Sequence, residues 1–372
     1  MNTGKRLDSL DALRGFDMFF ILGGASLIAA LCSLFPGGAD SWLAMQMDHV
    51  EWHGLRHHDT IFPLFLFISG MSFPFSYAKS MSLGVSKTGI YLKTLKRGLF
   101  LVLAGLVYQG ILNFEFADFR YAGVLQRIGL AWMFAALLYI TFPKVKVRAV
   151  IASVTLIGYW LLLQFVPAPD APGADPFSFE GNLVGYIDRC ILPGRLYEGT
   201  FDPEGILSTV PAIVTAMLGM FTGEFVRSES FAGKALTPQR KTVYLFAAAA
   251  ILLAAGLLWS LVFPVNKKLW TSSFVLVVAA YSVAMFALFY WIMDVKGWKK
   301  WAFFFKVIGM NSITIFFAQR VISFRNIGKF FFSGVAGLFP EQIGSIIISV
   351  AYIAAWWLFL LFLYRKKVFL RI

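Results

Sequence analysis

Charged residues and cysteines are scarce in this sequence. Only 14% of the 372 residues are charged, whereas soluble globular domains usually have about 25%, and the mean hydropathy is +0.72. This composition excludes a soluble enzyme, a disordered chain and a collagen-like fibre. The two cysteines, Cys32 in an apolar run and Cys190 in a polar loop, are too few for a disulfide framework. A phosphate-binding loop, a dinucleotide fingerprint and a zinc signature are also missing, which excludes the usual ATP-driven designs by motif.

What the sequence has instead is apolar residues in helix-length runs. Hydrophobic residues make up 59% of the chain, and a span needs about 20 apolar residues in succession. We expect an all-α, polytopic transmembrane helix bundle of about ten spans that forms one domain over 1–372. No cleavage site follows the first run, which favours a retained helix. The expected spans are 13–35, 60–81, 98–114, 123–142, 148–166, 206–226, 242–263, 271–293, 303–322 and 343–364.

Two connections differ from the others. The segment 167–205 is rich in proline, glycine and acidic residues, and we expect it to be the longest outside loop and functional. The segment 323–340 is too interrupted by glycine, arginine and lysine to span alone. We expect it to be an interfacial or re-entrant piece.

The net charge of +13 would suggest nucleic acid in a soluble protein, but here it is mainly a topology signal. With the N-terminus inside, the inner segments carry 23 of the 33 basic residues and 6 of the 20 acidic ones. The positive-inside rule therefore predicts that both termini are cytoplasmic. We expect membrane lipids rather than nucleic acid as partners, and some inner cations to meet an anionic cytoplasmic ligand.

All four histidines, His49, His53, His57 and His58, lie in one window on the outside. Imidazole exchanges protons near neutral pH, so a histidine here suits a general base or a nucleophile. Plain surface histidines are one alternative. A metal site is another, because positions 49, 53 and 57 have i, i+4, i+8 spacing. The window shows no clear helix and no nearby cysteine, so we expect no metal.

An aspartate, Asp59, opens the second expected span. An acid entering a membrane is costly unless it is paired or useful. It can orient an adjacent histidine, as carboxylates orient catalytic imidazoles, or it can cap the helix. The two roles are compatible. At the inner mouth of the first span, Asp11, Arg14 and Asp17 share roughly one face and can pair, which leaves a local ion pair and a cofactor role both open.

Other polar residues lie at or inside span ends. Arg120, Gln126 and Arg127 stand at the outside start of the fourth span, where a buried arginine can stabilise an oxyanion or reach toward headgroups. Asn311 lies inside a span, where it can link helices or line a pore. Glu204 follows Pro203 at the start of the sixth span, where an acid also suits the helix dipole.

Several sequence blocks, in one order along the chain, resemble the heparan-α-glucosaminide N-acetyltransferase family of membrane enzymes. Such an ordered set is far more specific than any single block. The blocks are RLDSLDALRG at 6–15, HVEWHGL at 49–55, DTIFPLFLFISGMS at 59–72, RYAGVLQRIG at 120–129, GYIDRCIL at 185–192, DPEGILST at 202–209, NKKLW at 266–270, GMNSI at 309–313 and the ending YRKKVFLRI.

The resemblance implies transfer of an acetyl group from cytosolic acetyl-CoA to the amine of an amino sugar or glycan on the other membrane face. It implies that His49 is the catalytic histidine, which agrees with its outside position. From position, the supporting catalytic candidates are Asp59, Arg127 and Asn311. The expected cofactor contacts are Arg14, Arg97 and Lys306, and the expected acceptor contacts are Trp52, Arg120 and Glu204.

Two departures from the family pattern bear on these expectations. The extra luminal domain and the extra N-terminal helix of the lysosomal enzyme are not in this chain, which favours a bacterial inner membrane. Ala25 stands about where the family has an asparagine. A sugar or lipid-precursor transporter, an O-acyltransferase of envelope glycans and a metal-binding protein remain alternatives, and a homodimer is open.

Overall fold

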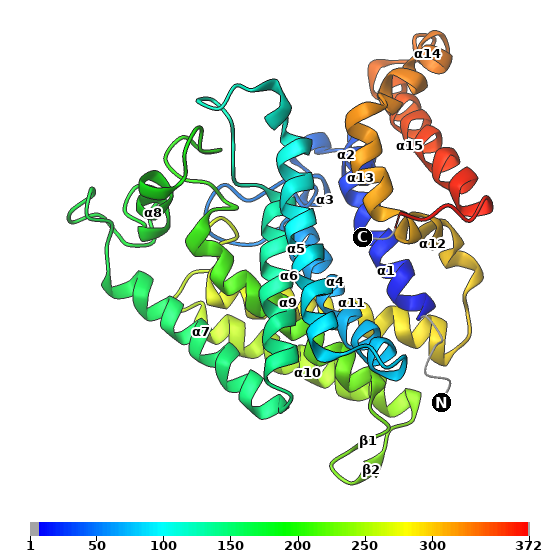
Figure 1. Ribbon diagram of the computed structural model, residues 1–372. Coiled ribbons are helices and arrows are strands. Elements are labelled where there is room, and N and C mark those ends of the chain that lie inside the picture. The colour runs from blue at the N-terminus through cyan, green and yellow to red at the C-terminus, as the bar shows by residue number, and fades with distance from the viewer. Residues whose placement is uncertain (1–6, 371–372) are drawn as a thin grey trace. The chain divides into compact units, whose positions relative to one another are not determined.

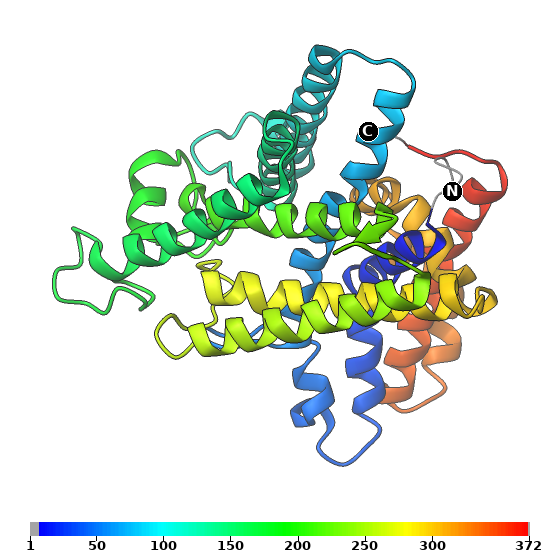
Figure 2. The same cartoon turned by 90° about the horizontal axis from the view of Figure 1, so that it is seen from below.

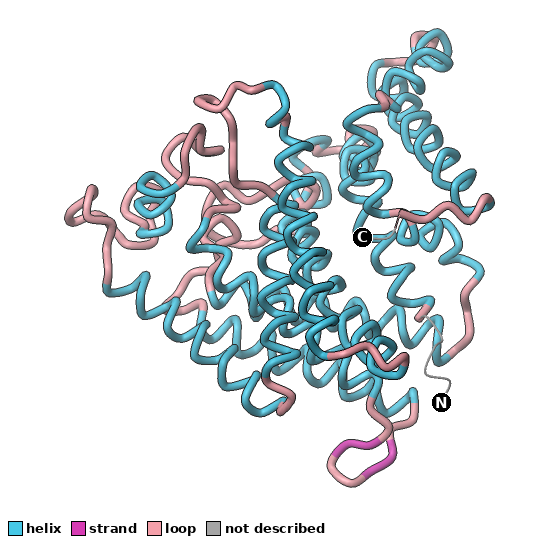
Figure 3. Tube along the Cα trace, viewed as in Figure 1, coloured by secondary structure: helices cyan, strands magenta, loops and turns pink. Residues whose placement is uncertain are grey.

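The computed structural model describes residues 7–370, which are mostly helical (Figures 1 and 3). The chain forms two compact units. Of the described residues, unit 1 contains 52–54 and 62–284, and unit 2 contains 7–51, 55–61 and 285–370. Within that described part, the two strands are β1 (Ser230–Phe231) and β2 (Lys234–Ala235), a short antiparallel hairpin seen at the bottom of Figure 3.

The all-α membrane fold is confirmed, and the chain is an integral membrane protein. Eight helices of the described chain are long and apolar enough to span a bilayer, and a ninth crossing results if one bent pair counts as a span. The expected span 98–114 overlaps a helix that starts at Lys87 and carries Lys93, Lys96 and Arg97. The total of ten spans therefore stays a prediction, as does the inside position of both termini.

Unit 1 is built of long helices joined by short turns on one side and longer loops on the other. Glycines bring its helices together: a Cβ added at Gly219 would lie 2.1 Å from the carbonyl oxygen of Phe67, and one at Gly223 would lie 2.3 Å from that of Met71. Small residues of this kind let membrane helices approach closely. The elements are α4 (His57–Ser82, whose first turn belongs to unit 2), α5 (Lys87–Gln109), η3 (Ile111–Asn113), α6 (Val124–Thr141), α7 (Val145–Phe165), α8 (Leu183–Ile191), α9 (Ile206–Arg227), α10 (Pro238–Trp259) and α11 (Ser272–Tyr290, whose end belongs to unit 2).

Helices α10 and α11 lie side by side in unit 1 (Figure 2). Gly256 of α10 allows this approach, because a Cβ there would lie 2.7 Å from a methyl group of Val277. The expected long loop is mostly irregular, but it also contains the nine-residue helix α8. The side chain of Asn182 starts this helix by accepting a hydrogen bond from the backbone N–H of Gly185 at 2.7 Å.

Unit 2 contains the N-terminal and C-terminal helices. Its helices α1 and α12 cross at two glycines, since a Cβ on Gly15 would lie 1.7 Å from the Phe305 carbonyl oxygen and one on Gly309 would lie 1.8 Å from that of Asp11. The elements are α1 (Asp8–Phe19), η1 (Phe20–Gly24), α2 (Ala25–Cys32), η2 (Gly38–Asp40), α3 (Trp42–Met45), η4 (Trp291–Val295), η5 (Lys300–Ala302), α12 (Phe303–Met310), α13 (Ser312–Val321), α14 (Phe324–Ala336) and α15 (Glu341–Arg365).

Two of the expected spans in unit 2 are interrupted. The first is helical over Asp8–Cys32, but Leu22 and Gly23 leave helical geometry, with φ of 109° at Gly23. The expected span 303–322 is bent, because α12 and α13 meet at 61° around Asn311, and whether it crosses the membrane stays a prediction. The segment 323–340, expected to be interfacial or re-entrant, contains helix α14, which packs along α15 (Figure 1).

Candidate active site

A histidine and an aspartate of unit 2 form the chemical centre of the candidate site. The Nδ1 of His49 and the Oδ1 of Asp59 are 2.7 Å apart. The side chain of Asp59 is 1% exposed, whereas that of His49 is 49% exposed. A carboxylate that accepts Nδ1–H fixes the neutral imidazole in the tautomer whose lone pair is on Nε2. The arrangement therefore presents a partly exposed base from a buried support.

The same carboxylate also starts helix α4. Its Oδ2 accepts backbone N–H groups from Arg56 at 3.0 Å and from Val50 at 3.2 Å. The backbone N–H groups at the start of a helix have no acceptor within the helix. An acidic side chain at the third helical position, such as Asp59, can accept the N–H of the residue that precedes the helix, here Arg56. Both roles expected of Asp59, as partner of a histidine and as a helix-end residue, are thus present in one side chain.

Neighbouring residues fix the chain on both sides of this pair. Arg56 donates from Nη1 to the carbonyl oxygen of His49 at 2.8 Å, and the backbone N–H groups of His57 and His58 donate to the side-chain and backbone oxygens of Gln46, both at 3.0 Å. The His58 ring lies 4.6 Å from the His49 ring. The window from 49 to 56 is irregular, as expected.

The apolar base beneath this pair includes the position at which the family pattern differs. Ala25, Phe20 and Ile61 form a buried cluster in unit 2, with Met47 packed against it. The His57 ring lies 4.6 Å from the Phe20 ring. Ala25 therefore contributes packing rather than a hydrogen-bonding group.

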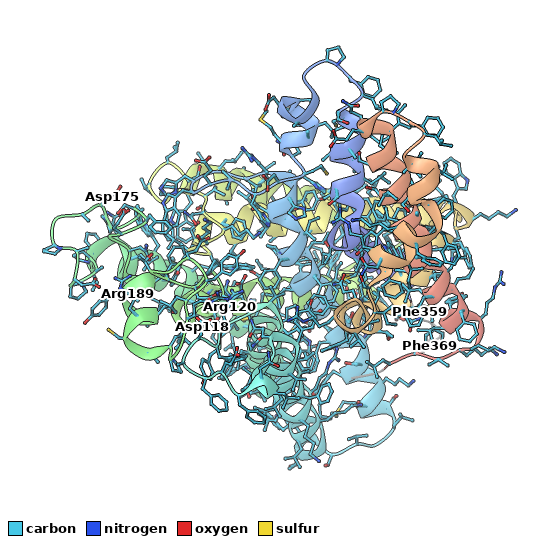
Figure 4. The ribbon with its side chains drawn as sticks, turned by 90° about the horizontal axis from the view of Figure 1, so that it is seen from above. Asp118, Arg120, Asp175, Arg189, Phe359 and Phe369 are labelled. Carbon is cyan, nitrogen blue, oxygen red and sulfur yellow. The ribbon has the colours of Figure 1, made fainter. Side chains whose placement is uncertain are left out.

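In unit 1, Arg120 is held by two acids from the turn that precedes α9, so Glu204 lies just before that helix rather than in its first turn. Its guanidinium donates to both carboxylate oxygens of Asp202, at 2.7 and 2.6 Å, and also to Glu204. Burial by itself would lower the pKa of Arg120, but the hydrogen bonds and negative charges of Asp202 and Glu204 outweigh it and raise that pKa. Arg120 is labelled in Figure 4. The two expected acceptor contacts, Arg120 and Glu204, thus bind each other.

A second arginine of unit 1, Arg127, is buried as expected. It donates to the carbonyl oxygen of Gly205 at 3.3 Å and to the hydroxyl of Ser208, and its guanidinium lies 4.9 Å from the centre of the Trp270 ring. These contacts tie α6 to the first turn of α9. The Nε and Nη1 of Arg127 are buried with no hydrogen-bond partner in the described part of the chain, so its expected oxyanion role stays a prediction.

Two buried acids of the long loop 167–205 were not singled out from the sequence. Asp188 accepts backbone N–H groups from Asp202 at 3.2 Å and from Ile206 at 3.0 Å, and burial raises the pKa of Asp188 to about 6. Asp202 accepts the two hydrogen bonds from the Arg120 guanidinium. Both acids lie in sequence blocks that resemble the family, and this resemblance could have marked them as candidates. Their hydrogen-bond partners could not be predicted, because those partners are distant in the sequence.

Trp52 lies in an aromatic corner of unit 1. Its Nε1 donates to the carbonyl oxygen of Phe177 at 2.8 Å, and its ring lies 5.3 Å from that of Phe179 and 5.7 Å from that of Phe201. Lys268 lies 6.0 Å from the centre of the Trp52 ring. Such a corner suits the apolar face of a sugar ring, with a cation at its edge.

A basic cavity lies at the start of α1 in unit 2. It has a volume of about 490 Å³ and is lined by Asp8, Met293, Lys299, Lys300, Phe303, Lys306 and Tyr364. Asp8 accepts from the Nζ of Lys306 at 2.6 Å and from that of Lys299 at 3.0 Å. Lys299 also lies 3.9 Å from Asp294, so the three ammonium groups exceed the two nearby carboxylates by one positive charge, which suits phosphate.

The remaining expected residues are spread over other environments. Arg14 pairs with Asp11 at 3.3 Å, but the expected pairing with Asp17 is wrong: Asp17 is fully buried and its carboxylate has no hydrogen-bond partner in the described chain. In unit 1, the Arg97 guanidinium lies 4.4 Å from the centre of the Trp132 ring. Asn311 is buried at the break between α12 and α13, where its amide has no hydrogen-bond partner from residues 7–370.

Metal ligands are not gathered anywhere in the described residues. No group of three or more histidine, cysteine, aspartate or glutamate side chains between 7 and 370 is arranged to hold an ion. The i, i+4, i+8 spacing of three histidines therefore does not produce a ligand set there.

Comparison with known proteins identifies the family of the chain. Residues 6–252 match the family model described as "Heparan-alpha-glucosaminide N-acetyltransferase, catalytic". The chain is similar to the heparan-alpha-glucosaminide N-acetyltransferases of Homo sapiens, at 29% identity, and Mus musculus, at 28% identity, over 99% of its own length. It covers 60% and 61% of the length of those two relatives. Since the family model matches well over half of the sequence, the chain belongs to the heparan-alpha-glucosaminide N-acetyltransferase family.

Proposed function

We propose that this protein transfers the acetyl group of cytosolic acetyl-CoA to the amine of a glucosamine-type sugar on the opposite membrane face. The observation that supports this most directly is the hydrogen-bonded pair of His49 and Asp59, at 2.7 Å. Family membership supports the reaction class. We also propose the bacterial inner membrane as its location, with both termini cytoplasmic.

The placement of two features within unit 2 supports transfer across the membrane. The basic cavity includes Asp8, the first residue of the interrupted span, whereas His49 follows the other end of that span, after Cys32. At the helical rise, this 25-residue span would reach at most about 37 Å, which exceeds the hydrocarbon thickness of about 30 Å. Lys299, Lys300 and Lys306 would hold phosphates of the cofactor on the inner side, and the acetyl end would meet His49 on the outer side.

The proposed chemistry requires one base at the outer end. The acceptor nitrogen attacks the thioester carbonyl, a C–N bond forms, and the C–S bond then breaks to release the CoA thiolate. Nε2 of His49 takes the proton that the nitrogen loses and returns it to the sulfur. Asp59 keeps the tautomer and stabilises the imidazolium between the two proton transfers. In an alternative route, Nε2 of His49 attacks the thioester and carries the acetyl group, and the amine then takes the acetyl group from Nε2.

The supporting roles follow from position. Asn311, with its unpartnered buried amide, is the proposed donor to the oxyanion, and Arg127 is a second candidate. Trp52 is the proposed stacking surface for the acceptor sugar. The charged groups of Arg120 and Glu204 bind each other. Their proposed role is therefore to position the loop that contacts the acceptor rather than to contact the acceptor themselves.

The decisive experiment compares binding and transfer in the purified protein. Calorimetry measures acetyl-CoA binding, and a radiolabelled acetyl group measures transfer to glucosamine, for the unmodified chain, for His49→Ala and for the histidine control His53→Ala. We expect all three to bind acetyl-CoA and only His49→Ala to lose transfer, by roughly 10²- to 10⁴-fold.

Three other results would contradict parts of this proposal. Full transfer by His49→Ala would refute the assigned base. Absence of acetyl-CoA binding in all three proteins would favour the transporter alternative, and family membership would then describe the fold alone. Acetylation of a hydroxyl with the amine untouched would identify an O-acyltransferase.

A further inference from the structure

Helix α14 carries an exposed polar face that the proposed transfer reaction does not use. Arg325, Asn326, Lys329 and Ser333 are all exposed, and at 100° per residue they fall within one 100° sector of the helix. We call these four residues the polar stripe. The helix turns a different face toward α15, where Phe324 and Gly328 are buried.

The depth of the polar stripe follows from how α14 packs. A Cβ on Gly328 would lie 3.0 Å from the backbone nitrogen of Tyr352, and one on Gly344 would lie 2.9 Å from the carbonyl oxygen of Ala336. The two helices are therefore antiparallel, and Gly328 faces the middle of the 25-residue span α15. The Phe324 and Phe359 rings, 5.6 Å apart, agree with this register.

Two cations of the polar stripe consequently lie near half the depth of a candidate span. Lys329 follows Gly328 directly, and Arg325 is one turn deeper, whereas Ser333 is one turn closer to the α15 N-terminus. Placing an exposed charge among acyl chains costs free energy. Such a charge is stabilised when water, lipid headgroups or a protein partner reach it. The stripe thus rises from the middle of the membrane toward one surface.

No acid among the described residues 7–370 pairs with these cations. The segment 295–340 contains seven basic residues and no aspartate or glutamate. Among residues 7–370, neither Arg325 nor Lys329 forms an ion pair or a side-chain hydrogen bond. A second copy that presented the same face across a two-fold axis would add like charges, which disfavours self-association there. The missing partner is therefore anionic and reaches the helix from the membrane.

Exposed aromatic rings flank the cations. Phe330 is 81% exposed and Phe332 is 45% exposed, and at 100° per residue they border the polar stripe on its two sides. An amphiphile with an anionic head and apolar tails matches this pattern, because guanidinium and ammonium groups bind phosphate and the rings contact acyl chains.

We propose that the polar stripe binds an anionic phospholipid, whose phosphate lies against Arg325 and Lys329 and whose acyl chains cover Phe330 and Phe332. The phosphate would lie below the plane of the other headgroups, as expected for local thinning of the bilayer around a buried charge. This site is independent of acetyl transfer, and it does not depend on which terminus is cytoplasmic.

The test uses the full chain reconstituted in vesicles of equal phosphatidylglycerol and phosphatidylcholine, followed by native mass spectrometry of the lipids that stay bound. The stripe variant is Arg325→Gln/Lys329→Gln. The control, Lys93→Gln/Lys96→Gln, removes two exposed cations from α5. We expect the ratio of retained phosphatidylglycerol to phosphatidylcholine to fall about tenfold in the stripe variant and less than twofold in the control.

The charge-conserving variant Arg325→Lys/Lys329→Arg separates binding from folding, since it should retain phosphatidylglycerol like the unmodified chain. Equal losses in the stripe variant and the control would overturn the proposal. So would an unchanged lipid ratio with conversion of a dimer to a monomer, which would mean that a second copy covers the stripe. An unchanged ratio with no change of mass would show that the cations simply extend to water.

Discussion

Replacement of Asp59 by asparagine separates the two roles of this side chain. The amide oxygen can still accept the backbone N–H groups of Arg56 and Val50, which lie 3.0 and 3.2 Å from Oδ2. The amide nitrogen then faces Nδ1 of His49 in place of the carboxylate oxygen at 2.7 Å. A donor at that position favours the tautomer with the proton on Nε2, which removes the base.

The expected magnitudes differ for activity and stability. Loss of general base catalysis costs roughly 10²- to 10⁴-fold in kcat. The lost charge-assisted hydrogen bond to a half-exposed ring costs at most about 1.5–3 kcal/mol of stability. Asp59→Ala also leaves the N–H groups of Val50 and Arg56 without their acceptor, at about 1–3 kcal/mol each where they are buried. Activity should therefore collapse in both variants, and stability mainly in Asp59→Ala.

The assay follows acetyl transfer to glucosamine at saturating acetyl-CoA, and a thermal melt in the same detergent measures stability. We expect Asp59→Asn to fall at least 100-fold in kcat, with a smaller loss of Tm than Asp59→Ala shows. We expect Asp59→Glu, which keeps the charge on a longer arm, to recover part of the rate. Asp59→Asn with more than a third of the normal kcat would refute the tautomer argument, whatever its Tm.

Three further outcomes can be measured. Gly219→Val should lower Tm strongly, because the first added carbon would lie 2.1 Å from the Phe67 carbonyl oxygen, and Gly158→Val, with open space at its Cβ, should not. Lys306→Gln should weaken acetyl-CoA binding by calorimetry about tenfold without lowering kcat at saturation. Burial raises the pKa of Asp188 from the ordinary 3.8 to about 6, so its contribution to stability is fully present below about pH 4 and is lost, by roughly 3 kcal/mol, as pH rises through 6. The free energy of unfolding of the unmodified chain should therefore fall between pH 4 and 6 relative to that of Asp188→Asn. Parallel stability curves for the two proteins would refute this pKa.

The helices could be predicted because hydropathy is a local property. Runs such as 206–226 and 343–364 match α9 and α15 closely, since about 20 apolar residues suffice to define a span. Hydropathy does not report the 61° bend at Asn311. The close approach of α1 and α12 at Gly15 and Gly309 could not be predicted either, because it joins two segments that are far apart in the sequence.

The histidine–aspartate pair could be anticipated because its two members are ten residues apart, in one connection and the start of the next helix. The Arg120 cluster could not, because Arg120 and Asp202 are 82 residues apart and meet only when the long loop folds back. The expected pairing of Asp17 failed for a related reason. Helical spacing shows which side chains share a face, but neighbouring segments decide which of them receive a partner.

The double use of the Asp59 carboxylate has a thermal consequence. Because one side chain both closes the first turn of α4 and aligns the His49 ring, fraying of that turn alone would misalign the base while the rest of the bundle stays folded. Such a protein would show two temperatures on heating: reversible inactivation first, then cooperative melting. The interval between them would measure the local stability of a single helical turn.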